Sequence, residues 1–186
     1  MPTSNNGNLF TRYRSPNPGA NVPHIYDDFL TDTICSDMPA DMPAIDGGQT
    51  LSQCFLGRKS KFNHCEKTKT TKYYLTALHD CVRTWGAPDR VLCDHVKYQS
   101  SSRVLDYLRL LWIGLWQSEA KYQHQNKFER RFQTLKHMVN RLMDRIDTPP
   151  QLWFLALVYC MHVLNHSSDP TVNSRQPIFV ATRKNW

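Results

Sequence analysis

The feature that most limits the fold of this chain is the order of its strand-like and helix-like stretches. Three stretches with strand character come first, helical and strand patterns then alternate, and two helices close the sequence. An early hairpin-like group followed by alternating elements is typical of an α/β sandwich with a mixed sheet. The predicted strands begin near Phe29 and cover 50–57, 61–66, 90–94 and 113–117, and the predicted helices cover 72–85, 101–112, 126–145 and 151–165.

The longest predicted helix, 126–145, shows its pattern most clearly. Its apolar residues recur at alternating steps of four and three, which gives one apolar stripe on a helix: Phe128, Phe132, Leu135, Val139, Leu142 and Ile146. Pro149-Pro150 ends this helix and starts the next, because proline suits a first helical turn. The order of elements matches a ribonuclease-H-like core, a mixed five-stranded sheet flanked by helices.

The chain divides into three parts by composition. Residues 1–24 are rich in Asn, Pro, Gly and Ser without an apolar period, which predicts a disordered lead-in. Residues 25–166 carry the strand and helix patterns and form one domain, and 167–186 are expected to be an irregular tail. The tandem repeat Asp-Met-Pro-Ala at 37–44 predicts a loop, because of its prolines and the glycines that follow.

The charge of the chain points to a polyanionic partner, with nucleic acid the first candidate. Its 186 residues carry a formal net charge of +7, and basic proteins attract phosphate backbones. The six cysteines show no CxxC pair or disulfide-like spacing, so we expect free thiols in a reducing compartment. The N-terminus has no apolar signal segment, and the longest apolar stretch, 152–164, is too short to span a membrane. The sequence therefore predicts an intracellular protein, in the nucleus or cytoplasm, that is neither secreted nor membrane-bound.

Three carboxylates on separate elements are candidate metal ligands. Asp94 ends the apolar run Val91-Leu92-Cys93, Glu129 lies one turn into the long basic helix, and Asp32 lies upstream in the first strand. Phosphoryl transfer at a DNA backbone uses two Mg²⁺ ions roughly 3.5–4 Å apart, and Mg²⁺ prefers oxygen ligands. If these three side chains converge, the sequence predicts a phosphoryl-transfer site.

Each carboxylate also has a purely structural interpretation. Asp94 can start a loop after a strand, Asp32 can flank a strand, and Glu129 is favoured by the helix dipole in a first turn. Three nearby acids compete with Asp32 for the role of first ligand: Asp37, Asp41 and Asp46. Residue type alone does not show whether any of the three carboxylates has a metal-binding or a structural role. The neighbouring residues in the sequence have to distinguish the two.

These neighbouring residues resemble a known family. Asp32-Thr33-Ile34 opens the first strand, and Gly86-Ala87-Pro88 precedes Val91-Leu92-Cys93-Asp94. Most specific is Trp116-Gln117-Ser118-Glu119, followed by Tyr122-Gln123-His124-Gln125-Asn126 and Glu129-Arg130. Over roughly 29–164 the chain resembles the integrase catalytic domain of copia-type retrotransposons, in the retroviral integrase superfamily. The spacing from Asp94 to Glu129 is close to that of the family.

The resemblance implies a triad of Asp32, Asp94 and Glu129 that binds Mg²⁺ or Mn²⁺ and serves both as metal site and as catalytic site. It also implies a ribonuclease-H-like fold and DNA as substrate, with end processing and strand transfer by one-step transesterification. Integrases act as multimers, so a homo-oligomer is a further expectation. The zinc module that precedes such cores has no counterpart here, which favours a fragment or degraded copy. The alternatives are an inactive nucleic-acid-binding remnant and a structure-specific nuclease.

The long helix is strongly basic and is the candidate DNA-binding surface. Phosphate contact is the functional interpretation of its polar and basic residues, and a solvated helix face is the structural one. The candidate nucleic-acid-binding residues are Gln125, Asn126, Lys127, Arg130, Arg131 and Lys136. The pairs His64/Cys65 and His162/His166 lack further ligands at zinc-like spacing, so a zinc site is not expected there.

Overall fold

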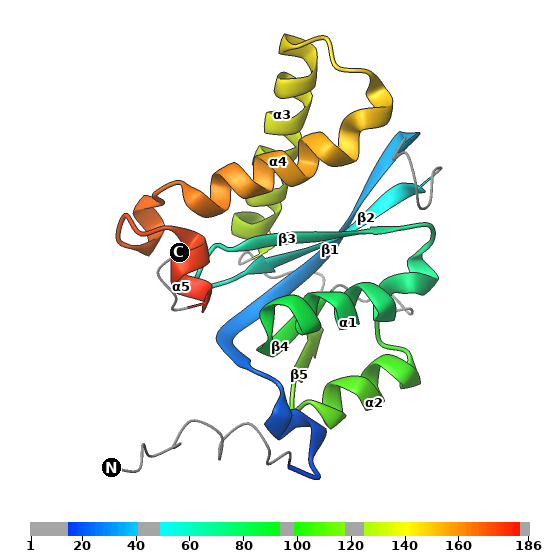
Figure 1. Cartoon of the computed structure of the whole chain (residues 1–186), viewed down its shortest axis with the longest axis vertical. Coiled ribbons are helices and arrows are strands. Elements are labelled where there is room, and N and C mark those ends of the chain that lie inside the picture. Colours follow the sequence, from blue (N-terminus) through cyan, green and yellow to red (C-terminus); the bar gives the residue numbers. More distant parts are fainter. Residues whose placement is uncertain (1–14, 41–48, 94–98, 118–124, 183–186) are drawn as a thin grey trace, which may run out of the picture.

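In the computed structural model a five-stranded mixed sheet, in the order β3-β2-β1-β4-β5, lies between two pairs of helices (Figure 1). The structure describes residues 15–40, 49–93, 99–117 and 125–182, except the side chains of 38–39, 49 and 125–129. Strands β1, β2 and β3 pair antiparallel, whereas β4 pairs parallel with both β1 and β5. The strands are β1 (His24–Ala40), β2 (Gln49–Gly57), β3 (Asn63–Thr68), β4 (Ala87–Cys93) and β5 (Gly114–Gln117).

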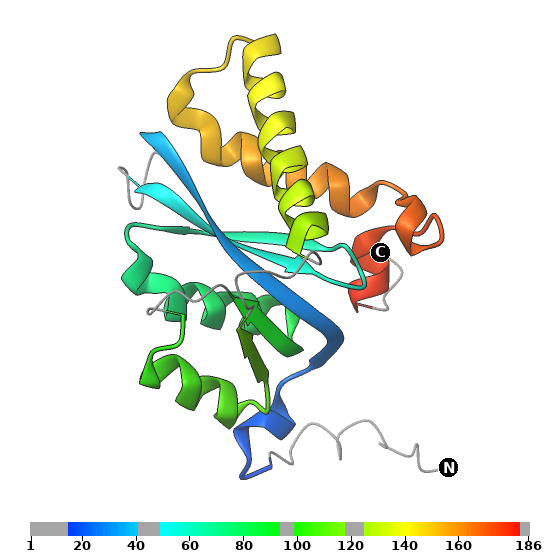
Figure 2. The ribbon, with the colours of Figure 1, turned by 180° about the vertical axis from the view of Figure 1, so that it is seen from behind.

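The helices cover opposite faces of the sheet, as the two views from front and back show (Figures 1 and 2). The first pair is α1 (Tyr74–Trp85) and α2 (Ser102–Leu110), and the second pair is α3 (Gln125–Arg145) and α4 (Trp153–His166). A short helix, α5 (Pro177–Thr182), lies near the start of β1, and four 3₁₀ turns are η1 (Pro18–Asn21), η2 (Thr71–Tyr73), η3 (Pro150–Leu152) and η4 (Pro170–Val172). The α/β class and the mixed five-stranded sheet flanked by helices are therefore confirmed.

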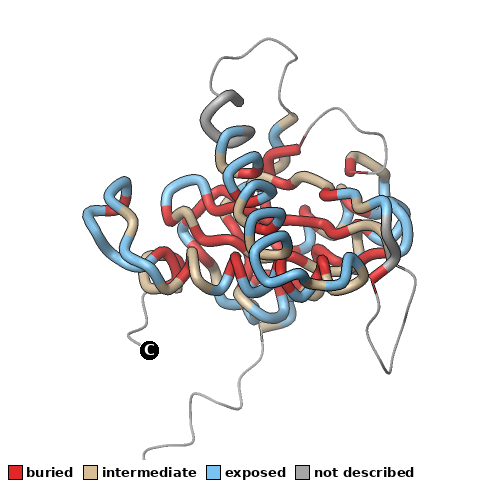
Figure 3. The backbone as a smooth tube through the Cα atoms, turned by 90° about the horizontal axis from the view of Figure 1, so that it is seen from above, coloured by how far each residue is buried: buried red, intermediate tan, exposed pale blue. Residues whose placement is uncertain are grey.

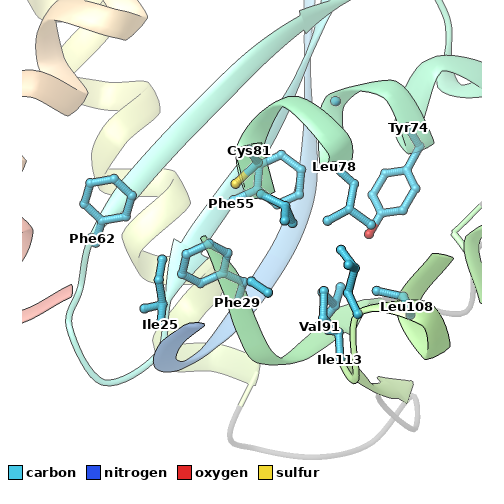
Figure 4. Close-up of a cluster of buried hydrophobic side chains, with 14 of the residues drawn as sticks. Ile25, Phe29, Phe55, Phe62, Tyr74, Leu78, Cys81, Val91, Leu108 and Ile113 are labelled. Carbon is cyan, nitrogen blue, oxygen red and sulfur yellow. The ribbon is translucent and has the colours of Figure 1, made fainter. Parts of the chain in front are cut away.

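Two apolar clusters hold these layers together. The first joins Phe29, Phe55 and Val91 of the sheet to Leu78 of α1 and Leu108 of α2, all at most 2% exposed (Figure 4). The second cluster takes its buried residues from β1, β2, β3, α3 and α4. Buried residues accordingly run through the middle of the molecule, between exposed helix faces (Figure 3). Because side chains alternate along a strand, β1 contributes Phe29 to one cluster and Leu30 and Ile34 to the other.

A single glycine fixes the crossover from α1 into β4. Gly86 has φ of +109°, which favours glycine, and its N–H donates to the Val82 carbonyl at 2.9 Å. A Cβ at this position would lie 2.5 Å from the Pro23 carbonyl oxygen. The sequence predicts Gly86-Ala87-Pro88 as a helix stop, and in the structure β4 already begins at Ala87.

Several local predictions differ from the structure. Strand β1 continues through the first Asp-Met-Pro-Ala copy to Ala40, so only 41–44 of the repeat fall outside the described residues. The β1–β2 register shifts between Cys35 and Ala40, an interval that contains Pro39, and proline cannot donate to the ladder. Asp32 consequently lies in the middle of β1 rather than at its start. Ile146, assigned to the apolar stripe, follows the end of α3 and is 63% exposed.

The two ends of the chain are more regular than their composition indicates. Within the predicted lead-in, residues 18–21 form η1 and Gly19 is buried, whereas 1–14 lie outside the described residues. Within the predicted irregular tail, η4 and α5 form, and Ile178 and Ala181 pack into the first cluster. Ile178 and Ala181 alone are too weak an apolar pattern to predict a helix. Their packing partners come from elements that are distant in the sequence. No helix in the described part of the chain is long and apolar enough to cross a membrane.

Candidate active site on the central strand

Asp32 lies on β1, the central strand, and its backbone and side chain are held by neighbours. The Thr33 N–H donates to Asp32 Oδ1 at 2.7 Å. The Gln53 side chain donates to the Asp32 carbonyl at 3.0 Å and accepts from Thr33 Oγ1 at 2.9 Å. Gln53 is 2% exposed, so these hydrogen bonds form away from solvent. The carboxylate of Asp32 is half-buried, which combines fixed orientation with access from solvent.

The alternation along β1 shows which face Asp32 occupies. Leu30 and Ile34 flank it at the two neighbouring positions of the same face, and both pack with the cluster of α3 and α4. Asp32 pairs across the antiparallel ladder with Cys54, which belongs to that cluster too. Asp32 therefore lies on the α3 face of the sheet, opposite to α1 and α2.

Lys136 of α3 and Asp32 both act on the Cys54 thiol. Burial raises the pKa of Cys54 well above its usual range, Cys65 and Asp32 raise it further, and Lys136 opposes them. Burial likewise raises the pKa of Cys65 to about 12, so both thiols stay protonated. Two charged groups of opposite sign, one from β1 and one from α3, thus lie within electrostatic range of the same buried thiol.

The other two candidate carboxylates are only partly described. Asp94 follows Cys93, the buried last residue of β4, and lies outside the described residues. Glu129 is the fifth residue of α3, but its side chain is outside the described set. Their backbone elements are nevertheless clear: Leu30 of β1 lies opposite Leu92 of β4, and Phe132 and Leu135 of α3 pack into the second cluster.

The predicted DNA-binding residues divide into three groups. The side chains of Gln125, Asn126 and Lys127 lie outside the described set, and Arg130 and Lys136 are exposed. Arg131 has internal partners: its Nη1 lies 2.7 Å from Asp169 Oδ2, and its Nη2 donates to the Lys61 carbonyl at 3.2 Å. The charge of Arg131 thus ties α3 to the η4 turn and to the β2–β3 turn.

The pair of Arg131 and Asp169 gives a pH prediction. Burial alone would raise the pKa of Asp169, but hydrogen bonds from Thr171 and the Arg131 guanidinium outweigh it and lower the pKa from 3.8 to about 2. Such a group stabilises the fold above its unfolded pKa and loses this effect as pH falls through its folded pKa. Asp169→Asn is expected to lower the free energy of unfolding by about 2 kcal/mol at pH 7. In urea titrations the gap to the parent protein should shrink as pH falls from about 4 towards 2, and a gap still undiminished at the lowest pH would contradict the assignment.

Two buried acids of β1 were not among the predicted site residues. Asp27 is 2% exposed and accepts hydrogen bonds from the N–H groups of Lys59 and Ser60 at 2.8 and 2.9 Å. Asp28 lies 3.6 Å from Arg58 Nη1 and 3.9 Å from Arg90 Nε. The only sequence signal is a pair of acids inside an apolar run. Asp27 thus braces the β2–β3 turn, and Asp28 contacts both this turn and strand β4.

Among the described residues no three His, Cys, Asp or Glu side chains form a metal-sized group. His64 Nε2 lies 2.9 Å from Glu66 Oε1, and the His166 Nδ1 lies 2.9 Å from the His162 carbonyl. His64 and His166 thus each have a local hydrogen-bond partner. Of the acids that compete with Asp32, Asp37 is exposed, and Asp41 and Asp46 are outside the described residues.

No family model matches the sequence, and no curated protein matches it. The fold is similar to that of the HTLV-2 integrase catalytic core domain, solved in complex with magnesium in a trimeric form. That likeness has a TM-score of 0.61 at 12% identity and covers 84% of this chain and 97% of that chain. A chain of the simian T-cell lymphotropic virus intasome, solved in complex with PP2A regulatory subunit B56 gamma, has a TM-score of 0.65 at 13% identity.

The likeness to the intasome chain covers 86% of this chain and 58% of that one. At such low identity both likenesses show a shared fold. The chain has the ribonuclease-H-like α/β architecture of retroviral integrase catalytic cores, as the order of its elements predicts.

Proposed function

We propose that residues 25–166 form an integrase catalytic core of the copia type, which acts on DNA through Asp32, Asp94 and Glu129. The observation that carries the proposal is the place of Asp32, a half-buried carboxylate on the central strand and on the α3 face of the sheet. The likeness in fold to retroviral integrase catalytic cores supports DNA integration as the general activity.

Strand register supports a partnership of Asp32 with Asp94. Leu30 lies opposite Leu92 in parallel pairing, and each leucine is followed two residues later by one of the two acids. Because paired residues on neighbouring strands point to the same face, we propose that these two acids act from one face of the sheet. Glu129 belongs to the helix that packs against this face, within its second turn.

The residues fit a hard divalent cation. Carboxylate oxygens are the ligands that Mg²⁺ and Mn²⁺ prefer, and the Thr33 N–H fixes one oxygen of Asp32 from the strand. We infer that Asp32, Asp94 and Glu129 hold Mg²⁺ or Mn²⁺, and magnesium in the HTLV-2 integrase core supports this. When bound, such ions activate the attacking oxygen and neutralise charge that develops on the phosphate.

The proposed reaction is a one-step phosphoryl transfer on DNA, a hydrolysis when water attacks and a transesterification when a DNA 3′-hydroxyl attacks. A water molecule or a DNA 3′-hydroxyl attacks a phosphodiester, one P–O bond forms, and the bond from phosphorus to the leaving 3′-oxygen breaks. The attacking group loses its proton and the leaving oxygen gains one. Arg130 and Lys136, both exposed on α3, would contact phosphates and so place the scissile bond opposite the carboxylates.

We propose that the chain acts as a homo-oligomer. Three large apolar residues of α4 remain exposed, although most other residues of the helix are buried: Leu155 at 45%, Val158 at 42% and Tyr159 at 57%. Their spacing places them on one face of the helix. Assembly of the HTLV-2 core as a trimer and of the simian virus protein in an intasome supports multimers.

A joining assay tests the proposed function. The protein is incubated with labelled duplex DNA and a target plasmid in Mg²⁺ or Mn²⁺, and EDTA serves as the control. The expected result is metal-dependent transfer of the labelled strand to the target. Salt-sensitive DNA binding without any joining would favour the inactive remnant, and cleavage without joining would favour the nuclease.

Arg130 and Arg131 make a matched pair for testing DNA contact. Arg130→Ala is expected to weaken DNA binding uniformly across sequences and to reduce the slope of log affinity against log salt by about 0.9. Arg131→Ala is expected to act through the loss of its bond to Asp169 and thus to lower stability. Fluorescence anisotropy at several salt concentrations, with urea unfolding alongside, measures both. An unchanged salt slope for Arg130→Ala would remove this residue from the DNA-binding surface.

A further inference from the structure

Two exposed residues, Arg90 in β4 and Trp116 in β5, lie close together on the α3 face of the sheet. Parallel pairing sets Asp28, Arg90 and Gly114 in one row across three strands, and Leu30, Leu92 and Trp116 in the next row. Paired residues point to the same face of a sheet. Leu30 packs with the α3 and α4 cluster, so Trp116 points to the α3 face as well.

The neighbours of Trp116 in its own strand agree with this direction. Leu115 packs against the first cluster, with α1 and α2, so Trp116 points the opposite way. The second cluster takes no described residue from β4 or β5. In Figure 2, α3 and α4 lie over the β1–β3 part of the sheet, away from β4 and β5. Trp116 is 49% exposed, which is a large apolar surface for a residue in a strand.

Arg90 is anchored beside this tryptophan and remains open to solvent. Its Nε lies 3.9 Å from Asp28 Oδ1, yet its side chain is 65% exposed. Gly114 makes room for it, since a Cβ there would lie 3.1 Å from Arg90 Cγ. Arg90 and Trp116 are diagonal neighbours on adjacent strands, a separation that long side chains can bridge. Asp28 thus orients an arginine that still has donors for a ligand.

We propose that Trp116 and Arg90 form a subsite for one nucleotide of a DNA strand. The indole stacks on an unpaired base and the guanidinium binds a phosphate of the same strand. Aromatic side chains that stack bases, beside cations that follow the backbone, are the general means of binding single-stranded DNA. The row of Trp116 is adjacent to that of Asp32 on the same face. This inference rests on the proposed function. It adds a binding site for the unpaired end of the DNA substrate.

The test is DNA binding without metal, which separates the subsite from catalysis. The probe is a single-stranded oligonucleotide that contains 2-aminopurine, whose fluorescence falls when the base stacks. Trp116→Ala is expected to weaken binding roughly 5- to 100-fold and to abolish the quenching. Trp116→Phe should keep both within a few-fold, because an aromatic ring remains.

Matched controls come from exposed residues elsewhere in the chain. Trp112 is 60% exposed at the turn between α2 and β5, and Trp112→Ala should leave binding unchanged. Arg90→Ala should weaken binding, whereas Arg83→Ala on α1, with a side chain 82% exposed, should not. Equal effects of the two tryptophan variants would overturn the subsite. So would a change of oligomeric state in Trp116→Ala without loss of DNA affinity, which would assign this surface to a protein contact.

The two proposals fail in different ways. If Trp116→Ala loses DNA affinity while the parent protein joins no DNA, the subsite stands and the integrase proposal falls. If the parent protein joins DNA and Trp116→Ala binds the probe like the parent, the integrase proposal stands and the subsite falls.

Discussion

Asp94→Asn is expected to lower metal-dependent DNA joining on the order of a thousand-fold or more, with DNA affinity retained or slightly raised. Asparagine has the size of aspartate but lacks the anionic oxygen that a hard cation requires. Removal of one negative charge beside a phosphate backbone cannot weaken electrostatic attraction to DNA. Asp32→Asn and Glu129→Gln should behave in the same way, since each of the three would supply oxygen ligands to the proposed metal site.

Asp37→Asn is the matched control for this series. Asp37 lies on the same strand as Asp32, five residues further on, and its side chain is exposed. It is also one of the acids that compete with Asp32 for the first ligand position. Full activity in Asp37→Asn together with loss in Asp32→Asn would support the assignment. The reverse result would make Asp37 the first ligand, and activity in all four variants would mean that the carboxylates do not carry the reaction.

Metal binding can be followed without catalysis. Mn²⁺ titration of the parent protein, monitored by calorimetry, should give binding that is lost in Asp32→Asn and kept in Asp37→Asn. This readout holds even if the protein joins no DNA. A parent protein that binds Mn²⁺ and DNA but joins nothing would point to a core that keeps its site and has lost its reaction.

The architecture was predictable because it depends on the periods of the apolar pattern. The 3.6-residue period of α3 indicates which face of the helix is buried, and the apolar run of β4 indicates a strand buried on both faces. Leu135 in α3 and Val91 in β4 are accordingly 1% and 0% exposed. Such signals are local and need no knowledge of strand order.

Long-range polar contacts were not predictable for the converse reason. In the sequence, Arg131 is one of several cations in a basic helix. Only the fold brings Asp169 within 2.7 Å of it. Asp28 reads as a polar interruption of a strand until parallel pairing sets Arg90 opposite to it. The exposure of Trp116 also depends on which strands the helices cover. In both ion pairs the partner is far away in the sequence, so the spacing of residues does not predict the contact.

A further long-range contact joins β3 to the C-terminal end of α4 through two buried asparagines. The Asn63 N–H donates to Asn165 Oδ1 at 2.8 Å, and Asn165 Nδ2 donates to the Asn63 carbonyl at 2.7 Å. The Asn63 side chain adds a third bond to the same oxygen at 3.2 Å. Both residues are buried, at 4% and 7% exposed. One side-chain amide therefore satisfies both backbone groups of Asn63 in a place with little access to water.

Asn165→Ala is therefore expected to lower the free energy of unfolding by about 2–4 kcal/mol, because it leaves a buried N–H and a buried carbonyl without this partner. Asn165→Asp should cost at least as much, since a carboxylate cannot donate to the Asn63 carbonyl and its charge would be buried. Asn140→Ala, at an exposed position of α3, is the control and should change stability by less than about 0.5 kcal/mol. Urea unfolding at pH 7 measures all three, and a loss in Asn165→Ala no larger than that of the control would show that water replaces the bonds. The effect concerns the Trp116 subsite and the carboxylates only through folding, so the folded fraction of Asn165→Ala should bind DNA like the parent protein.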